Sequence, residues 1–253
     1  MMKRVLALVL CLCALCSFAL AEGNEEILKS FVLHHGDRNV NKIAITVDDC
    51  YKSATEWIER DVEMCKQYGI KMTFFPLVHT GCLEEAYRDL WQSVLDAGCE
   101  IGTHSTRHTK LGNRDVRTII ASLALSQEAL DKTLGYHYQI RCFRPPYGSV
   151  AKGDKISEYQ VQQAIRRYGY EHVIHWDVSQ MKDMRKALES TKNGSILLFH
   201  TKKPDTLFLE KLIPELQARG FEMVTVSELF GFDPPEISDE LYVYSWDQFE
   251  NKK

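Results

Sequence analysis

The sequence lacks the features that would divide it into parts: it has no internal repeat, no low-complexity stretch and no linker rich in Pro, Gly or Ser. It also lacks a basic excess, because 31 Lys and Arg residues stand against 35 Asp and Glu residues, for a net charge of -4. A protein that binds nucleic acid normally displays a basic surface, so this balance argues against that class. We therefore expect a single domain that binds no nucleic acid.

An apolar run of roughly 20 residues, the length needed to span a bilayer, is missing as well. The first residues instead have the order of a secretory signal: a basic region at Lys3-Arg4, an apolar stretch from Val5 to Phe18, and the small-x-small sequence Ala19-Leu20-Ala21. We expect residues 1–21 to be removed and residues 22–41 to form an N-terminal extension. The mature chain, at a net charge of -6 without Lys3 and Arg4, is expected to be secreted or held in the cell envelope, with no stable membrane insertion.

Beyond residues 1–21, cysteine pairs at the CxxC spacing are absent too. Three of the eight cysteines lie within residues 1–21, which leaves Cys50, Cys65, Cys82, Cys99 and Cys142. An odd number without paired spacing identifies neither a disulfide framework nor a cysteine zinc site. We expect buried cysteines, with one or two bridges at most.

Short apolar runs alternate with amphipathic stretches along the rest of the chain, which predicts parallel strands with helices outside them. Strands are expected near residues 42–47, 72–78, 100–102, 142–143, 172–176, 195–199 and 222–225, and helices near 53–68, 83–97, 115–134, 157–168, 182–190 and 206–218. The first of these helices is expected to begin at a capping box, Ser53-Ala54-Thr55-Glu56. About seven strands can close into a barrel. The sequence thus predicts one α/β domain over residues 42–231, followed by a C-terminal tail, 232–253, that packs across its outside.

Several polar residues directly follow the end of a predicted strand. They are Asp48-Asp49, His104, Arg144, Trp176-Asp177 and His200. In α/β barrels the carboxyl ends of the strands share one face, and active sites lie there. We therefore expect these residues to meet at one site.

The spacing of His104 and His108 allows both imidazoles to bind one metal ion, from a helical turn or from a tight loop. One added carboxylate completes a three-ligand site with a position open for water. If Asp49 is that ligand, its neighbour Asp48 points the other way and is free to act as a general base, and His200 is the natural proton donor. Each feature also has an ordinary interpretation, since such histidines occur on surfaces and in cores and paired aspartates often cap helices.

Four strings carry a resemblance to a known family: Thr46-Val47-Asp48-Asp49, His104-Ser105-Thr106-Arg107-His108, Arg144-Pro145-Pro146-Tyr147-Gly148 and Leu197-Leu198-Phe199-His200. In this order and rough spacing the chain resembles the polysaccharide deacetylases, the carbohydrate esterase family 4 type with a chitooligosaccharide deacetylase homology domain. The resemblance covers about residues 42–229. It implies a distorted (β/α) barrel with fewer than eight complete units.

The resemblance also implies roles for single residues. Asp49, His104 and His108 would bind a divalent transition metal, with zinc as the first expectation. Asp48 would be the general base and His200 the general acid.

Two further roles come from the same source. The backbone N–H of Tyr147 would stabilise the oxyanion of a tetrahedral intermediate. Arg144 would orient the base through a charge-assisted hydrogen bond.

The chain departs from the family pattern at two places. Cys50 stands where the family usually has Gly, which would narrow the site or change what fits. The family also carries an Asp-Trp pair that tunes the acid and forms a wall of the sugar pocket. Here Trp176 is the candidate wall and Asp183, or Asp177, the candidate tuning acid.

These expectations lead to an exported, metal-dependent hydrolase that removes acetyl groups from an N-acetylated polysaccharide, such as peptidoglycan or chitin, and acts as a monomer. One alternative is an esterase of the acetyl-xylan type, which needs the same metal and base but less help from an acid. Another is a non-catalytic glycan-binding relative that kept the fold.

Overall fold

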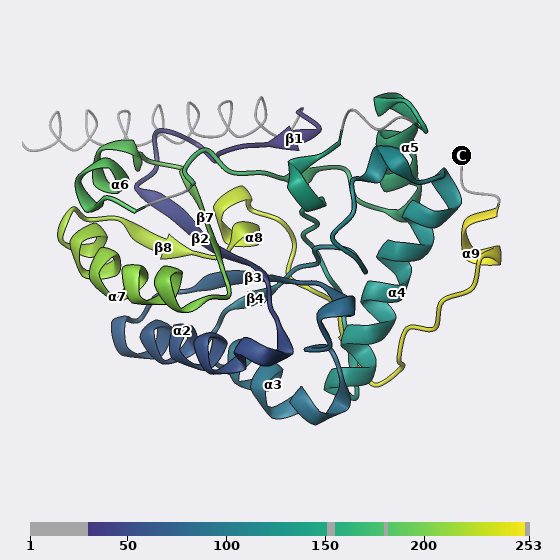
Figure 1. Ribbon diagram of the computed structural model, residues 1–253, viewed down its shortest axis with the longest axis horizontal. Helices are drawn as coiled ribbons and strands as arrows, with labels where there is room; N and C mark the ends of the chain where they lie inside the picture. Colours follow the sequence, from purple (N-terminus) through teal and green to yellow (C-terminus); the bar gives the residue numbers. More distant parts are fainter. Residues whose placement is uncertain (1–29, 151–154, 180–181, 251–253) are drawn as a thin grey trace, which may run out of the picture.

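The computed structural model describes residues 30–150, 155–179 and 182–250 (Figure 1). The expected signal peptide at residues 1–21 lies outside these ranges. Within them, no helix combines the length and the apolar character that crossing a membrane requires.

A parallel sheet in the order β4-β3-β2-β7 forms the centre of the molecule, and β8 also pairs with β2. The strands are β2 Lys42–Asp49, β3 Met72–Pro76, β4 Glu100–Ile101, β7 Ile196–His200 and β8 Glu222–Val224. In β2 every residue from Ile43 to Asp48 is buried. An almost unbroken apolar run is typical of a parallel strand that is covered on both faces.

Backbone contacts continue this sheet into a ring. Thr103, just after β4, bridges to Phe143 in parallel, and the N–H of Ile174 donates to the carbonyl oxygen of Phe143 at 2.9 Å. Val178 then bridges to Leu197 of β7, also in parallel. The strands outside the central sheet are β1 Val32–Leu33, which pairs with β6 Val173–Ile174, and β5 His137–Tyr138, which pairs with β9 Ile237–Ser238. The prediction of a distorted barrel in a single domain is confirmed.

Helices surround the barrel in the order α6, α7, α2, α3, α4 and α5, each in contact with the next (Figure 1). Their bounds are α2 Thr55–Tyr68, α3 Arg88–Asp96, α4 Val116–Leu134, α5 Glu158–Tyr168, α6 Met184–Ser190 and α7 Lys203–Ala218, and two short helices follow, α8 Val226–Phe230 and α9 Asp247–Glu250. These bounds agree with the predicted helices to within a few residues. The capping box expected at Ser53 is wrong, because Lys52–Ala54 forms a 3-10 turn and α2 begins without a side-chain cap.

The C-terminal segment runs along the outside of α4 and α5, as expected for the tail (Figure 1). The Asp131 carboxylate on α4 accepts the N–H of Tyr242 at 2.8 Å, and the Arg167 guanidinium on α5 donates to the carbonyl oxygen of Phe249 at 2.8 Å. The Phe249 side chain is buried against the rings of Tyr168 and Trp246. At the other end, β1 lies within the segment expected as an extension, yet it pairs with β6.

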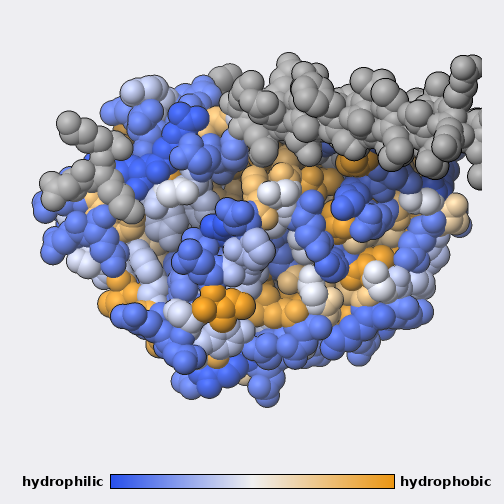
Figure 2. All heavy atoms as spheres, turned by 180° about the vertical axis from the view of Figure 1, so that it is seen from behind, coloured by the Kyte–Doolittle hydropathy of each residue, from blue (hydrophilic) through white to orange (hydrophobic). Residues whose placement is uncertain are grey.

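The core is formed by apolar side chains from the strands and from the inner faces of the helices. The opposite side of the molecule, seen in Figure 2, is mainly hydrophilic, with smaller hydrophobic areas between the polar residues. Exposed apolar atoms scattered in this way are normal for a folded domain.

Candidate active site

The strand register brings three chain segments to one edge of the sheet. Asp48, at the end of β2, lies beside His200 of β7 on one side and Phe75 of β3 on the other. Asp49 is level with Pro76, the last residue of β3. The parallel register alone therefore places both carboxylates and His200 at the carboxyl-terminal edge, as the sequence predicted.

The loop that carries the two histidines is fixed by a close backbone approach. A Cβ atom on Gly102 would lie 2.6 Å from the Phe75 ring and 2.9 Å from the carbonyl oxygen of Cys142, so only glycine fits between these neighbours. After it, the N–H of His104 donates to the carbonyl oxygen of Pro76 at 3.0 Å. The Ser122 hydroxyl on α4 holds the loop at Ser105, at an oxygen–oxygen distance of 2.8 Å.

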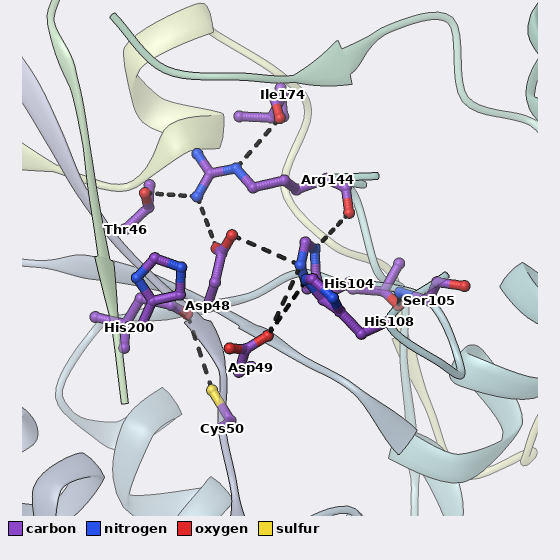
Figure 3. Close-up of polar contacts among 12 residues, drawn as sticks. Thr46, Asp48, Asp49, Cys50, His104, Ser105, His108, Arg144, Ile174 and His200 are labelled. Carbon is purple, nitrogen blue, oxygen red and sulfur yellow. Dashed lines mark hydrogen bonds and ion pairs between the residues drawn. The ribbon is translucent and has the colours of Figure 1, made fainter. Parts of the chain in front are cut away.

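The side chains of Asp49, His104 and His108 converge, with one ligand atom from each lying within 4.8 Å of the others (Figure 3). The Nε2 atoms of both histidines lie 3.9 Å from Oδ1 of Asp49. Burial lowers the pKa of His104, which favours the neutral form of its ring. Both distances are longer than a hydrogen bond. They are the separations of three ligand atoms that face a common point.

Two observations show that a metal ion fits these residues. Oδ1 of Asp49 is buried and has no hydrogen-bond partner among the described residues, which is costly unless a cation or another donor satisfies it. Nδ1 of His104 donates to the carbonyl oxygen of Arg144 at 2.7 Å, which leaves the Nε2 lone pair directed at the shared point. A second hydrogen bond of this kind is the usual support of a metal-binding histidine.

Asp48 stands beside this triad and is held by a buried arginine. The Arg144 guanidinium, 0% exposed, donates to Oδ1 of Asp48 at 2.8 Å and to the hydroxyl of Thr46 at 2.7 Å (Figure 3). Its other nitrogens donate to the carbonyl oxygens of Ile174 and His175. Asp48 is therefore oriented by a charged partner and lies next to the triad.

His200 faces Asp48 from β7, and its environment favours the protonated ring. The Asp205 carboxylate lies 3.7 Å from Nδ1 of His200 and accepts the backbone N–H of the same residue at 2.9 Å. Asp205 is the largest cause of a raised pKa at His200. Partial burial opposes the rise, and Asp48 and Asp49 add smaller contributions in the same direction as Asp205. A histidine whose pKa is raised in this way is suited to donate a proton.

The candidate tuning acids lie elsewhere. The carboxylate of Asp183 accepts the N–H of Lys186 and caps α6. That of Asp177 accepts from Arg38 and from the N–H of Ile196. Asp205 lies beside His200, where a tuning acid was expected, because α7 begins soon after β7 ends. The sequence contained one usable signal that was missed, an acid five residues after His200 at the start of a helix.

Residues with strained backbone conformations cluster around this site. Among the described residues, the non-glycine residues with positive φ are Asp49, Cys50, Ser105 and Tyr147, with φ values of 74°, 52°, 79° and 60°. Such conformations cost of order 1–3 kcal/mol each and persist where the surroundings hold them, commonly at functional sites. The exposed Tyr147 ring packs against His108 at a centroid distance of 4.2 Å.

The structure also places Trp176 and Cys50, the two residues that the sequence analysis discussed for the substrate side. Trp176 lines a cavity of about 630 Å³ together with His200, Phe208 and two lysines. Cys50, by contrast, does not narrow the site: its thiol is buried in the core and points to the carbonyl oxygen of Val47.

Comparisons with known proteins agree with this geometry. A family model described as polysaccharide deacetylase matches residues 35–173. A bifunctional xylanase/deacetylase of Pseudobutyrivibrio xylanivorans is 29% identical over 198 residues, which cover 76% of this chain and 31% of that protein. A peptidoglycan-N-acetylglucosamine deacetylase of Listeria monocytogenes is 26% identical over 197 residues, which cover 75% of this chain and 39% of that protein. The chain thus spans well under half the length of these curated relatives.

Among solved structures, a CE4 family pseudoenzyme from Bacillus anthracis matches with a TM-score of 0.66 and 19% identity, over 84% of this chain and 73% of the other. At this identity the likeness concerns the fold alone. Because that neighbour is a pseudoenzyme, the fold does not establish activity, and the argument for activity must come from the side chains of this chain.

Proposed function

The chain belongs to the polysaccharide deacetylase family, and we propose on this basis that it is an exported, metal-dependent hydrolase that removes acetyl groups from an N-acetylated polysaccharide. One observation carries the proposal: the Asp49, His104 and His108 triad lies beside Asp48, and His200, whose pKa is raised, lies level with Asp48 on the neighbouring strand. A glycan-binding relative without activity would not need a separate base and a separate acid.

The residues divide the chemistry among them. A divalent cation bound by Asp49, His104 and His108, zinc in our proposal, would polarise the acetyl carbonyl and acidify the attacking water. Asp48 takes the proton of that water, and the buried bond from Arg144 keeps its carboxylate in place. The backbone N–H of Tyr147 donates to the oxygen that becomes negative.

His200 then donates its proton to the departing sugar amine. An amine leaves poorly without a proton, whereas an alkoxide leaves more readily, so the raised pKa of His200 favours amide over ester hydrolysis. We therefore place N-acetylglucosamine-type units ahead of acetylated xylan as substrates, and the cell envelope or the medium as the site of action.

The test combines one variant with metal analysis. Asp48→Asn keeps the shape of the side chain but cannot accept a proton, so acetate release from an N-acetylglucosamine oligomer should fall by about 10²–10⁴-fold while metal content is unchanged. Chelator should abolish the activity of the unaltered protein, and added zinc should restore it. Retained activity in Asp48→Asn would show that another group is the base. Faster acetate release from acetylated xylan than from the oligomer would assign the esterase function.

A further inference from the structure

The cavity beside His200 lies on the substrate side of the site. Its lining includes His200 but none of the triad residues, so it extends away from the proposed metal. Its volume of about 630 Å³ exceeds what an acetyl group needs. Because His200 would protonate the sugar nitrogen, the group that enters this cavity is the sugar or its ring substituents.

The apolar part of the lining suits a sugar ring. Trp176 and Phe208 are both partly exposed, and both line the cavity. The indole of Trp176 is held in place by the Arg144 guanidinium, whose Cζ atom lies 5.6 Å from the ring centre. Aromatic rings of this kind supply a large apolar contact area.

The charged part of the lining does have a preference. The lining contains two lysines, Lys182 and Lys202, and one acid, Asp205. The Asp205 carboxylate already contacts both Lys202 and His200. Within the part of the chain that the structure describes, Lys182 forms no ion pair. The cavity therefore has a positive excess in a chain whose net charge is -4. An anion that enters the cavity would pair with Lys182.

We propose that this cavity selects an acetylated glycan unit that carries a carboxylate, with Lys182 as the residue that recognises it. The inference rests on the proposed function, because it names the substrate class of the same site. Two common glycan units have the required group: a muramic acid, through its lactyl ether, and a uronic acid attached to an acetylated xylan.

The test compares substrates that differ only in charge. Peptide-free strands of alternating N-acetylglucosamine and N-acetylmuramic acid are used with free lactyl carboxylates and after methyl esterification, and acetylated glucuronoxylan is treated in the same two ways. An exposed ion pair is worth up to 1 kcal/mol, so kcat/KM should be about 2- to 5-fold higher for the free acid. The advantage should shrink at high ionic strength, which screens exposed charges. The glycan that shows it identifies the source of the carboxylate.

Variants assign the effect to the cavity. In Lys182→Gln the ratio of free acid to ester should fall toward one. In Lys211→Gln, an exposed lysine of α7 outside this lining, the ratio should stay as in the unaltered protein. Equal rates for acid and ester in the unaltered protein would overturn the inference while leaving the proposed function in place.

If no glycan releases acetate, the proposed function is refuted. A binding measurement then tests carboxylate recognition by the cavity separately. Titration calorimetry of Asp48→Asn with the same strands then reports on the cavity alone. Tighter binding of the free acid than of the ester would support carboxylate recognition if the difference disappears in the double variant that carries both Asp48→Asn and Lys182→Gln. Equal affinity for acid and ester would refute it.

Discussion

Arg144 is a fully buried cation whose cost is offset by its partners. The guanidinium lies 4.4 Å from the centre of the Phe75 ring, bonds to the buried carboxylate of Asp48, and donates to three further oxygen atoms. Breaking a buried pair by removing one partner leaves the other charge without compensation. The same residue therefore bears on both catalysis and folding.

Arg144→Met should lower the free energy of unfolding by about 3–5 kcal/mol, measured by urea denaturation. Arg141→Met is the matched control, because the partner of Arg141 is an exposed Asp233 and such a pair contributes at most about 1 kcal/mol. Asp48→Asn should recover part of the loss in Arg144→Met, since it removes the orphaned charge. A loss below 1 kcal/mol in Arg144→Met would contradict the view that this pair is a buried one.

Asp205 should set the alkaline limb of the pH profile. The pKa of His200 is raised in the folded protein, first by Asp205, so the proton needed for the leaving group is kept to higher pH and is lost as the pH rises through that pKa. Asp205→Asn removes the charge but still offers an oxygen to the backbone N–H of His200. The alkaline limb of kcat/KM should move to lower pH, with the acid limb in place.

Glu210→Gln provides the control for this shift, because Glu210 lies on the same helix and pairs with Arg60 instead. Its profile should match that of the unaltered protein. An unchanged alkaline limb in Asp205→Asn would mean that another group sets it.

At the scale of elements, the sequence predicted the strands and the edge at which they end, because both follow from local apolar patterns and from parallel pairing. It did not predict β1, β5 or β9, since each has two residues, too few to stand out, and gains its structure by pairing with a distant strand. The start of α2 was wrong for a different reason: Ser53 has the pattern of a cap, but the strained turn at Asp49 and Cys50 sets the chain direction before it.

The same distinction between local patterns and long-range packing explains which site residues the sequence predicted. Asp48, Asp49, His104 and His200 were found because each lies at, or shortly after, the end of a strand. Asp205 was missed because its place beside His200 depends on how α7 packs after the strand, and the one local signal was its position five residues after His200 at the start of a helix.

The C-terminal segment gives a prediction about an element. Phe249 is 3% exposed and fills a space between α5 and the tail, so Phe249→Ala should cost up to about 3 kcal/mol. The loss is limited because the tail can detach without unfolding the barrel. Detachment should appear as faster chymotrypsin cleavage within residues 242–249. Val243→Ala, at a position 64% exposed, should stay within about 0.5 kcal/mol of the unaltered protein.

At the scale of the whole molecule, the same fold occurs in a pseudoenzyme, so activity has to be tested at this chain's own side chains, beginning with the triad. The ligands come from β2 and from the loop after β4, which are separated by α2, β3 and α3 in the sequence. An ion that bridges them binds the folded chain only, because the unfolded chain has no such site. Metal binding and global stability are therefore linked.

Zinc should raise the melting temperature. At a free concentration of about 100 times its Kd, a ligand specific for the folded state adds about 2.7 kcal/mol. For a chain of this size that corresponds to roughly 5–10 °C. His108→Ala removes a partly exposed ligand at little cost to the core, and it should abolish the increase while leaving the melting temperature without metal nearly unchanged. His79→Ala, a histidine outside the triad, should keep the full increase. An equal rise in all three proteins would mean that zinc binds elsewhere, and no rise in any of them would remove the metal from the proposed function.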